Sequence, residues 1–396
     1  MTWEVGKMGD YCEITSSKRI FYSEYSESGV PFYRSKEIIE RNQGQPISEP
    51  LFITCDKYNQ IKKKFGVPVS GDMLLTSVGT IGIPYIVKDT DHFYFKDGNL
   101  TWFRNFNNKL NSKYLYYWIE SNVGQKILYN TTIGSSQKAL TISALKNIEI
   151  SFPSMNIQCR IVDILSAYDD LIENNRKQIK LLEEAAQRLY KEWFVDLRFP
   201  GYEHTKIVDG VPEGWEKKSL SDIADVTMGQ SPKSEFYNHI NEGLPFHQGV
   251  GSYGNRFVND KIYSTSFTRI AKAGSILFSV RAPVGRLNIT KNKIVIGRGI
   301  AALNHKNGLQ SFLFYMLKER FFKDNLVGNG SIFASISKDE LLNQEFIISS
   351  KDILLKYDRM AHIIDNKISA LDKQIELLIQ ARDRLLPKLM SGEVEV

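Results

Sequence analysis

Residues 161–193 read IVDILSAYDDLIENNRKQIKLLEEAAQRLYKEW. Alternating steps of four and three residues place a row of side chains on one seam, and all are apolar except Asn175. Residues 357–385 repeat this pattern with Arg382 as the polar exception. Because steps that average 3.5 residues keep a seam facing a partner helix, the pattern predicts two long coiled-coil helices.

The two helices belong to one chain, so we expect them to pair with each other in antiparallel orientation. A pseudo-twofold axis would then relate the two halves of the chain, and Asn175 and Arg382 would help to set the register, as buried polar seam residues can. The alternative is two long amphipathic helices that pack on separate globular cores.

The segments that precede the helices also repeat. Residues 71–82 (GDMLLTSVGTIG) align with residues 274–285 (GSILFSVRAPVG), 203 positions later. Such β-branched and apolar runs between glycines predict strands. The predicted strands are 72–78, 80–87, 275–280 and 293–296, and the predicted short helices within each segment are 112–129 and 311–326. The fold class is therefore α+β: two β-rich domains and two long helices, in a pseudo-twofold internal repeat.

Helix signals give the boundaries. Ser154 and either Ser349 or Ser350 are suitable N-caps, and Pro387 predicts a stop or kink near Leu386. The expected organisation is a first β-rich domain (1–153), a long helix (154–198), a linker (199–215), a second β-rich domain (216–350), a second long helix (351–390) and a tail (391–396).

Composition narrows the class of protein. The chain has 396 residues, 42% of them hydrophobic, which is enough to bury real cores. No stretch approaches the roughly 18 apolar residues of a membrane span, and no signal peptide begins it, so we expect a cytoplasmic protein without a membrane partner. The net charge of +6 permits a polyanionic partner and does not require one.

A search for catalytic motifs is negative. The chain has no Walker-type phosphate loop, and its six histidines show no metal-ligand spacing. It lacks the Asn/Asp-Pro-Pro-aromatic tetrapeptide of adenine methyltransferases. The carboxylate pairs 169–170 and 183–184 fall on the long helices as solvated faces. We therefore expect no catalytic residue, no metal and no cofactor bound by this chain.

Both β-rich domains instead carry loops of basic, amide and hydroxyl residues. Arg and Lys can neutralise phosphates, and Gln, Asn and Arg can pair with base edges. The candidate DNA-binding residues are Arg34, Lys36, Ser77, Thr80, Ser135, Ser136, Gln137, Lys138, Gln230, Ser231, Lys233, Tyr253, Asn255, Arg256, Arg281, Arg286, Asn329 and Ser331.

In this order around a tandem repeat, several segments resemble the specificity subunit of type I restriction–modification systems. They are 275–285 (SILFSVRAPVG), similar to the core of a target-recognition domain, 153–162 (PSMNIQCRIV), 189–194 (LYKEWF), 198–201 (RFPG) and 212–215 (PEGW). The second helix start at 349–352 lacks the proline and glutamine of the first. Residues 76–82 lack an arginine like Arg281.

The resemblance implies a non-catalytic subunit in which each β-rich domain is a target-recognition domain that reads half of a bipartite, asymmetric site in double-stranded DNA. It implies two methyltransferase subunits and restriction subunits as partners, which would carry S-adenosylmethionine, ATP and Mg²⁺. The alternative is a coiled-coil scaffold whose β-rich domains bind protein or glycan partners. A self-contained nuclease or methyltransferase is disfavoured by the missing motifs.

Overall fold

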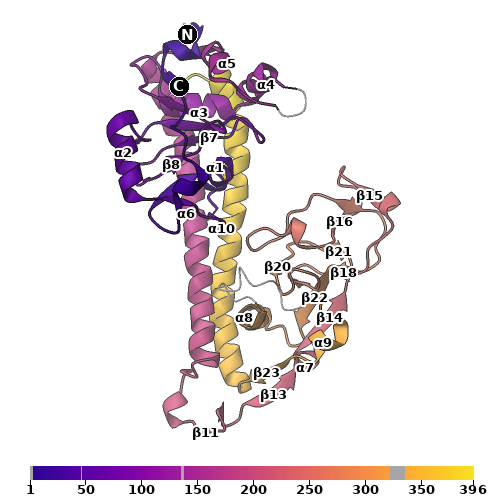
Figure 1. Cartoon of the computed structure of the whole chain (residues 1–396). Helices are drawn as coiled ribbons and strands as arrows, with labels where there is room; N and C mark the ends of the chain where they lie inside the picture. Colours follow the sequence, from indigo (N-terminus) through magenta and orange to yellow (C-terminus); the bar gives the residue numbers. More distant parts are fainter. Residues whose placement is uncertain (1–2, 46, 135–137, 322–334) are drawn as a thin grey trace. The chain divides into compact units, whose positions relative to one another are not determined.

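The computed structural model describes residues 3–45, 47–134, 138–321 and 335–396 (Figure 1). The chain divides into two compact units: unit 1 comprises residues 1–176 and 373–396, and unit 2 comprises residues 177–372. Each unit contains one β-rich domain and a part of each of two long helices, α6 (Met155–Phe194) and α10 (Lys351–Ser391).

The long helices are antiparallel in each unit taken by itself. In unit 1, Asn175 Nδ2 donates to Gln374 Oε1 at 3.3 Å, and Arg382 Nη1 lies 2.6 Å from Asp169 Oδ1. Residue numbers thus rise along α6 as they fall along α10. In unit 2, the Tyr357 hydroxyl donates to the Ala186 carbonyl at 3.2 Å. The predicted antiparallel pairing is confirmed, and both polar seam residues make contacts between the helices.

Pro387 does not end the second helix. The helix α10 continues to Ser391 with Pro387 inside it, so the predicted stop near Leu386 is wrong. Leu386, Leu389 and Met390 are buried in the core of unit 1. Burial of these side chains favours continuation of the helix by about 1.5–3 kcal/mol each, which is comparable to the cost of one interior proline.

The β-rich domain of unit 1 contains two four-stranded sheets. The first is antiparallel, in the order β2 (Glu13–Thr15), β9 (Leu100–Arg104), β6 (Met73–Thr76) and β7 (Pro84–Ile86). The second has the order β3 (Tyr25–Ser26), β5 (Phe52–Ile53), β4 (Val30–Tyr33) and β8 (Tyr94–Phe95), with β4 and β8 parallel. The strands β1 (Glu4–Lys7) and β10 (Glu149–Phe152) pair at the two ends of the domain sequence.

The helices of this domain are short: α1 (Ser35–Asn42), α2 (Cys55–Phe65), α3 (Ser112–Glu120), α4 (Asn122–Thr131) and α5 (Ile142–Lys146). The single helix predicted over 112–129 is wrong, because Ser121 adopts an extended backbone and separates α3 from α4. Its hydroxyl accepts a hydrogen bond from the Gly124 amide, which caps α4.

The β-rich domain of unit 2 repeats this plan. Its four-stranded antiparallel sheet has the order β14 (Ala224–Met228), β22 (Ile300–His305), β19 (Ile276–Ser279) and β20 (Leu287–Ile289). Its five-stranded sheet has the order β15 (Tyr237–Asn238), β17 (Tyr263–Ser264), β16 (Leu244–His247), β21 (Ile294–Ile296) and β18 (Ile270–Ala271), with β16 and β21 parallel. The closing pair is β13 (Glu216–Ser219) with β23 (Glu345–Ile348).

Three helices complete this domain: α7 (Leu220–Ile223), α8 (Gln310–Phe321) and α9 (Lys338–Leu342). Before it, residues 199–215 contain the short hairpin β11 (Ile207–Val208) and β12 (Val211–Pro212). Phe199 and Trp215 at the two ends of this segment are buried.

The internal repeat extends to individual contacts. Tyr117 on α3 donates to Asp169 on α6 at 2.6 Å, and Tyr315 on α8 donates to Asp365 on α10 at 2.8 Å. The predicted repeat and the α+β fold class are therefore confirmed. In both units the short helix of the β-rich domain shares one apolar core with the long helices, through side chains such as Trp118 and Leu165 in unit 1 and Phe312 and Tyr357 in unit 2.

Candidate nucleic-acid interface

The strand order of unit 2 gathers its loops at one end of the domain. Neighbours in the sheet β14-β22-β19-β20 are antiparallel, so β14 and β19 finish where β22 and β20 begin. The parallel strands β16 and β21 finish at that end too, because residues 297–299 lead directly from β21 into β22. We call residues 229–233, 248–256, 280–286 and 297–299 the loop end of unit 2.

Close backbone contacts fix these loops against one another. A Cβ atom on Gly229 would lie 2.1 Å from the Gly297 carbonyl oxygen, and one on Gly299 would lie 2.4 Å from the Gln248 carbonyl oxygen. The Gln230 amide donates to the Ile296 carbonyl at 2.9 Å, and Ser231 Oγ accepts from the Arg298 amide at 3.3 Å. The loop end is thus ordered by contacts that involve its main chain.

Basic and amide side chains are exposed on this frame. Gln230, Lys233, Asn255 and Arg281 are exposed, and Arg298, which the sequence analysis did not select, is exposed as well. Within the described part of the chain, no carboxylate pairs with Arg281 or Arg298. Lys233 lies 3.8 Å from Glu235, a distance that gives little stabilisation for two exposed groups. The exposed charge of the loop end is therefore mainly positive.

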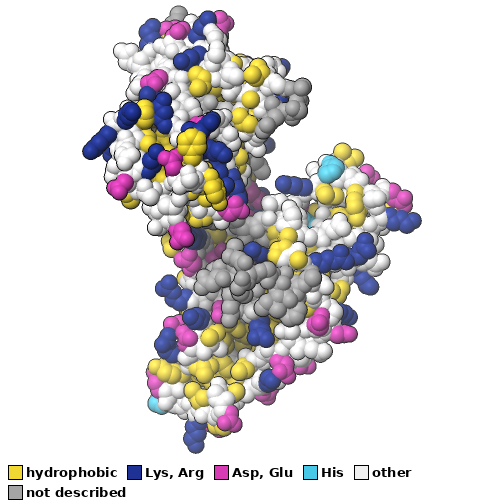
Figure 2. Space-filling view, viewed as in Figure 1, with side chains coloured by type: hydrophobic (Ala, Val, Ile, Leu, Met, Phe, Trp, Pro, Cys, Tyr) yellow, Lys and Arg dark blue, Asp and Glu magenta, His cyan; other side chains and the backbone are white. Residues whose placement is uncertain are grey.

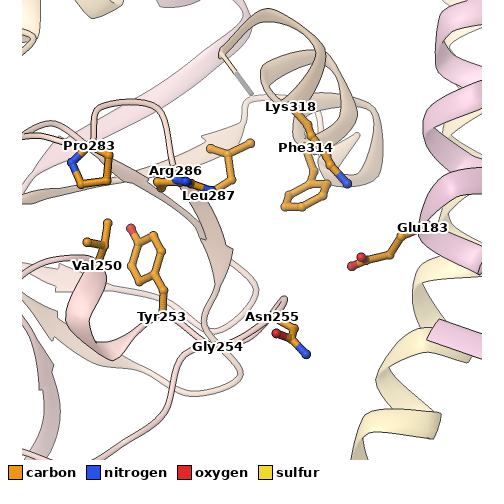
Figure 3. A pocket seen from close by; sticks show the side chains of 10 residues that line it. All are labelled: Glu183, Val250, Tyr253, Gly254, Asn255, Pro283, Arg286, Leu287, Phe314 and Lys318. Carbon is orange, nitrogen blue, oxygen red and sulfur yellow. The ribbon is translucent and has the colours of Figure 1, made fainter. Parts of the chain in front are cut away.

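Arg286 lies on the turn between β19 and β20. Ser279 Oγ accepts from the Arg286 amide at 2.8 Å and donates to the Pro283 carbonyl at 2.6 Å, which holds the turn in shape. Arg286 lines a pocket of about 440 Å³ together with Tyr253, Asn255 and Lys318 (Figure 3). The Tyr253 ring rises beside Val250 toward this turn, and Glu183 approaches from α6 on the opposite side (Figure 3).

The Tyr253 hydroxyl is a buried polar group. Its oxygen has no hydrogen-bond partner among the described residues, and burial raises the pKa of this phenol, so it stays protonated at neutral pH. Tyr253 therefore supports the loop with its ring and offers a donor to the pocket.

Two of the predicted contact residues are buried and are not available to DNA. Arg256 is 4% exposed, with its guanidinium held by carboxylates of both long helices. Ser77 is 2% exposed, and its hydroxyl lies 2.7 Å from that of Thr101. Their residue types fit DNA contact, but their positions at the base of a loop and the end of a strand turn the side chains inward. For these two residues the prediction is corrected.

The loop end of unit 1 is built in the same way from residues 16–21, 34–36, 77–83 and 96–99. Its frame is held by the Ser77 amide, which donates to the Asn99 carbonyl at 2.8 Å, and by the Lys96 amide, which donates to the Tyr33 carbonyl at 2.8 Å. Thr80 is exposed at a turn. Lys138, which follows 135–137, lies with its Nζ 3.4 Å from the centre of the Tyr129 ring.

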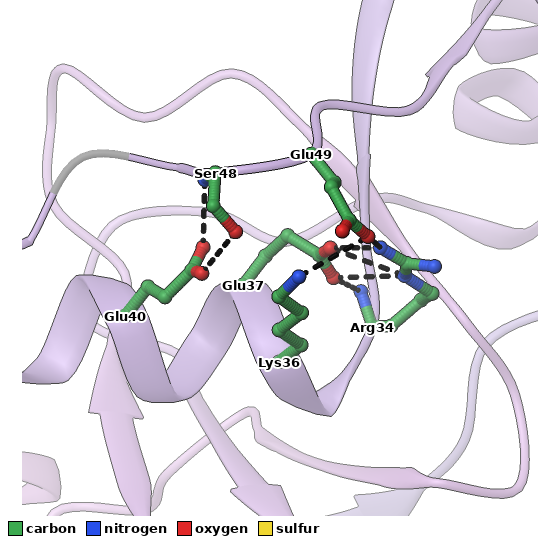
Figure 4. A network of polar contacts seen from close by, with 6 residues as sticks. All are labelled: Arg34, Lys36, Glu37, Glu40, Ser48 and Glu49. Atoms are coloured by element: carbon green, nitrogen blue, oxygen red, sulfur yellow. Dashed lines mark hydrogen bonds and ion pairs between the residues drawn. The ribbon is translucent and has the colours of Figure 1, made fainter. Parts of the chain in front are cut away.

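The basic residues of this loop end have acidic partners. The Arg34 amide and guanidinium both donate to the buried Glu37 carboxylate, which caps α1 (Figure 4). Glu49 lies 3.1 Å from Lys36 and 3.8 Å from Arg34. Arg34 and Lys36 both lie beside Glu49, within a network that already neutralises part of their charge. The predicted residues Ser135, Ser136, Gln137, Asn329 and Ser331 lie outside the described residues.

The sequence-family model of the type I restriction modification DNA specificity domain matches this chain twice, at residues 1–184 and at residues 212–385. The chain belongs to this family. Its members are non-catalytic components of type I restriction–modification systems, and the family accounts for the repeat as two specificity domains.

Relatives of this specificity-domain chain match it over its whole length. The type I restriction enzyme MjaIX specificity subunit of Methanocaldococcus jannaschii is 29% identical over 430 residues, covering 100% of this chain and 94% of that protein. The MjaVIII specificity subunit of the same organism is 24% identical over 426 residues, covering 100% and 93%. The crystal structure of a type I system S subunit from M. genitalium shares the fold, with a TM-score of 0.60 and 18% identity over 98% of this chain and 96% of that one.

The specificity-domain chain shows no metal site in its described parts: no group of three or more His, Cys, Asp or Glu side chains there is placed to hold an ion. No helix in the described ranges is long and apolar enough to cross a membrane. The chemistry available at the two loop ends is hydrogen bonding and charge neutralisation.

The sequence reasoning missed several exposed groups of unit 1. Lys18 and Arg19 follow β2, and Phe21 and Tyr22 after them are 61% and 88% exposed. Lys18 Nζ lies 4.7 Å from the ring of Phe65, which ends the basic run 62–65 of α2. Figure 2 shows Lys and Arg side chains interleaved with hydrophobic ones over the region of α2. The run KRIFY at 18–22 was the available signal, since basic residues interleaved with aromatics are typical of nucleic-acid surfaces.

Proposed function

We propose that the chain reads a bipartite, asymmetric sequence in double-stranded DNA, one half-site with each loop end. The observation that carries this proposal is the pair of equivalent loop ends, which share a frame and differ in their side chains. Duplicated readers with unlike contacts suit two unlike half-sites. We take residues 1–153 and 216–350 as the two target-recognition domains. The protein- or glycan-binding scaffold is not retained, because the family gives it no support.

In unit 2, Arg281 is the candidate for a base contact. It is exposed and lies on a turn held by Ser279, and arginine pairs bidentately with guanine in the major groove. Gln230 and Asn255 carry amides that suit adenine. Lys233 and Arg298 flank them and suit phosphates, which position a protein on the duplex without specifying sequence. Ser231 and Arg286 complete the set at this loop end.

In unit 1, Arg34, Lys36, Thr80 and Lys138 keep their proposed DNA contacts. Lys18, Arg19 and the lysines of the run 62–65 are added as phosphate contacts, because they extend the positive surface beside the loop end. Phe21 and Tyr22 are added as groups that can pack on the sugar and base faces of the groove.

Membership of the family places the chain in a type I restriction–modification complex with DNA. We propose that it binds two methyltransferase subunits through the long helices. Restriction subunits would join the complex through the methyltransferase subunits. The partners would supply S-adenosylmethionine, ATP and Mg²⁺, because the family is a non-catalytic component of these systems.

The test is to map methylated adenines in host DNA with and without this chain, the methyltransferase subunit being present in both. Methylation confined to one bipartite motif, and lost without the chain, is the expected result. Methylation of the same motif by the methyltransferase subunit alone would overturn the proposal. A binding assay with the assembled complex adds a second measure, since specific affinity should fall steeply with salt.

A further inference from the structure

Arg256 is the most enclosed charged group of the loop end of unit 2. Its side chain is 3% exposed, although it follows the exposed Asn255 directly in sequence. A buried arginine is costly unless every part of the guanidinium is paired. Its burial therefore indicates that the Arg256 side chain acts inside the domain rather than at the solvent-exposed surface.

Three different helices hold this guanidinium. Nη1 lies 3.2 Å from Glu183 Oε1 on α6 and donates to the Tyr315 hydroxyl on α8 at 3.3 Å. Nη2 donates to Asp365 Oδ1 on α10 at 2.5 Å, and Tyr315 donates to the same oxygen at 2.8 Å. The Arg256 Cζ atom also stacks 4.3 Å from the centre of the Phe314 ring. Both long helices thus contribute a carboxylate to one arginine of a loop.

The main chain around Arg256 ties the same loop to the sheet. The Ile289 amide on β20 donates to the Arg256 carbonyl at 2.9 Å, and Asn288 Nδ2 donates to the Gly254 carbonyl at 2.9 Å. Residues 250–258 therefore have two attachments, one to the sheet through the backbone and one to the helices through Arg256. Asn255 lies between Gly254 and Arg256, Tyr253 directly precedes them, and both line the pocket beside Arg286.

Among the residues of unit 1 that the structure describes, no loop arginine reaches the equivalent carboxylate. Asp169 accepts from Tyr117 as Asp365 accepts from Tyr315, but its arginine is Arg382, which comes from α10. The arginine in unit 1 joins helix to helix, whereas the arginine in unit 2 joins a loop to both helices.

We infer that Arg256 is a positioning residue for DNA recognition by unit 2. It holds residues 250–258 in their binding geometry before DNA arrives, so the half-site preference of unit 2 depends on an ion pair buried between its loop and the long helices. Preorganised contacts retain more of their interaction energy because less ordering is needed on binding. The inference rests on the proposed function and adds to it the side chain on which one half-site depends.

The test uses the complete complex of the chain with its methyltransferase subunits and the variant Arg256→Lys. A lysine keeps the charge, but its single ammonium cannot reach Glu183, Tyr315 and Asp365 together. Glu319→Gln is the matched control, because Glu319 on α8 also joins this domain to a long helix, by accepting from Gln187 Nε2 on α6 at 2.7 Å. Arg281→Ala identifies which half-site belongs to unit 2.

Two measurements are made on each complex: binding to DNA libraries randomised at one half-site at a time, and amide hydrogen exchange of 250–258. Arg256→Lys should lower discrimination at the half-site of unit 2 by about tenfold, the effect of one lost base-pair contact. It should leave the other half-site unchanged and speed exchange in 250–258. The control should change neither.

An unchanged preference, or an equal loss at both half-sites, would overturn the positioning role. If Arg256→Lys does not assemble, Glu183→Gln replaces it, because this variant keeps the pair with Asp365. A two- to threefold loss at the same half-site then supports the role, and no loss overturns it. A wild-type complex without sequence preference would instead refute the proposed function itself.

Discussion

The loop ends of units 1 and 2 share a backbone and differ in the charge that the backbone carries. The Lys96 amide donates to the Tyr33 carbonyl in unit 1 as the Gly297 amide donates to the His247 carbonyl in unit 2, both at 2.8 Å. The next residue is Asp97 in unit 1 and Arg298 in unit 2. Asp97 lies 2.9 Å from Arg19 and compensates its charge, whereas no carboxylate of the described residues pairs with Arg298.

The short helices show the same difference. The Tyr117–Asp169 and Tyr315–Asp365 bonds identify α3 and α8 as equivalent helices of the repeat. In this alignment Glu120 of unit 1 corresponds to Lys318 of unit 2. Glu120 lines a pocket of about 300 Å³ with Arg382 and Asp383. Lys318 lines the pocket of unit 2 with Arg286. The strand order fixes where loops gather, and the side chains decide whether that place is neutral or positive.

The largest expected effect separates Arg281 from Lys36. Arg281→Ala should weaken DNA binding by the complex by about 1–3 kcal/mol and relax preference at one base pair, because a bidentate base contact is lost. Lys36→Ala should weaken DNA binding by less than about 1 kcal/mol, since the Glu49 carboxylate, 3.1 Å from the Lys36 ammonium, already compensates its charge. Titration of labelled specific and altered duplexes measures both. Equal losses would contradict the difference between the two loop ends.

The dependence of binding on salt sharpens the comparison at Arg298. Arg298→Gln should reduce the slope of log affinity against log salt by about 0.9, as for one lost phosphate contact. Arg19→Gln should change the slope by less, because Asp97 already compensates the charge of Arg19, which then neutralises less phosphate charge and releases fewer counterions from DNA. The slopes come from binding isotherms between low and physiological salt. A larger change for Arg19 than for Arg298 would show that the partner carboxylate does not matter.

The pH dependence of unfolding tests Glu120. Burial raises the pKa of Glu120 from 4.5 to about 7. The folded chain thus binds more protons than the unfolded chain between about pH 4.5 and 7, so the free energy of unfolding falls as pH rises through this range. Glu120→Gln should remove that slope and stabilise unit 1 by about 1 kcal/mol at pH 8, less than the full shift, because the Glu120 side chain is only partly buried.

Urea unfolding at pH 5 and pH 8 measures this difference. Lys318→Gln is the control at the equivalent position of unit 2, and it should keep the wild-type loss of stability between pH 4.5 and 7, because Glu120 is still present. If the free energy of unfolding of Glu120→Gln still falls between pH 4.5 and 7, the pH dependence belongs to another titratable group.

The smallest expected effect is a gain. Glu49→Gln removes the carboxylate shared by Arg34 and Lys36 and leaves the buried Glu37 as the cap of α1. DNA binding should strengthen by about 0.5 kcal/mol, since the positive charges of Arg34 and Lys36 are then no longer compensated by Glu49. The measurement is the dissociation constant at low salt. Ser48→Ala, which removes only a hydroxyl bonded to Glu40, is the control.

The periodicity of residues 161–193 and 357–385 was enough to predict the helices, their pairing and the repeat, because apolar seam residues leave few arrangements. Pro387 was misjudged because the burial of Leu389 and Met390 depends on tertiary contacts. At the candidate site, residue type selected Arg281, Gln230 and Lys233 as DNA contacts, and these three side chains are exposed on the loop end. It could not separate them from Arg256, since only the fold determines which arginine turns inward.

Arg298 and Lys18 were missed for a similar reason. Arg298 is a single basic residue in an ordinary loop, and Lys18 belongs to the short basic and aromatic run 18–22, which was a weak local signal. Both gain meaning only when the fold brings their loops beside others. The acidic partners Glu49 and Asp97 are equally invisible in sequence, because each is distant along the chain from a basic group that it neutralises.

The pairing of Asn175 with Gln374 joins residues 199 positions apart, and this spacing bears on how the chain folds as it is synthesised. At about 5–20 residues per second, a ribosome needs roughly 10–40 s to make the intervening segment. During that interval the first helix is complete, but the second is not yet available to cover its apolar seam. The nascent chain therefore presents a bare hydrophobic stripe for tens of seconds, which makes it a natural client for chaperones until its own C-terminal half arrives.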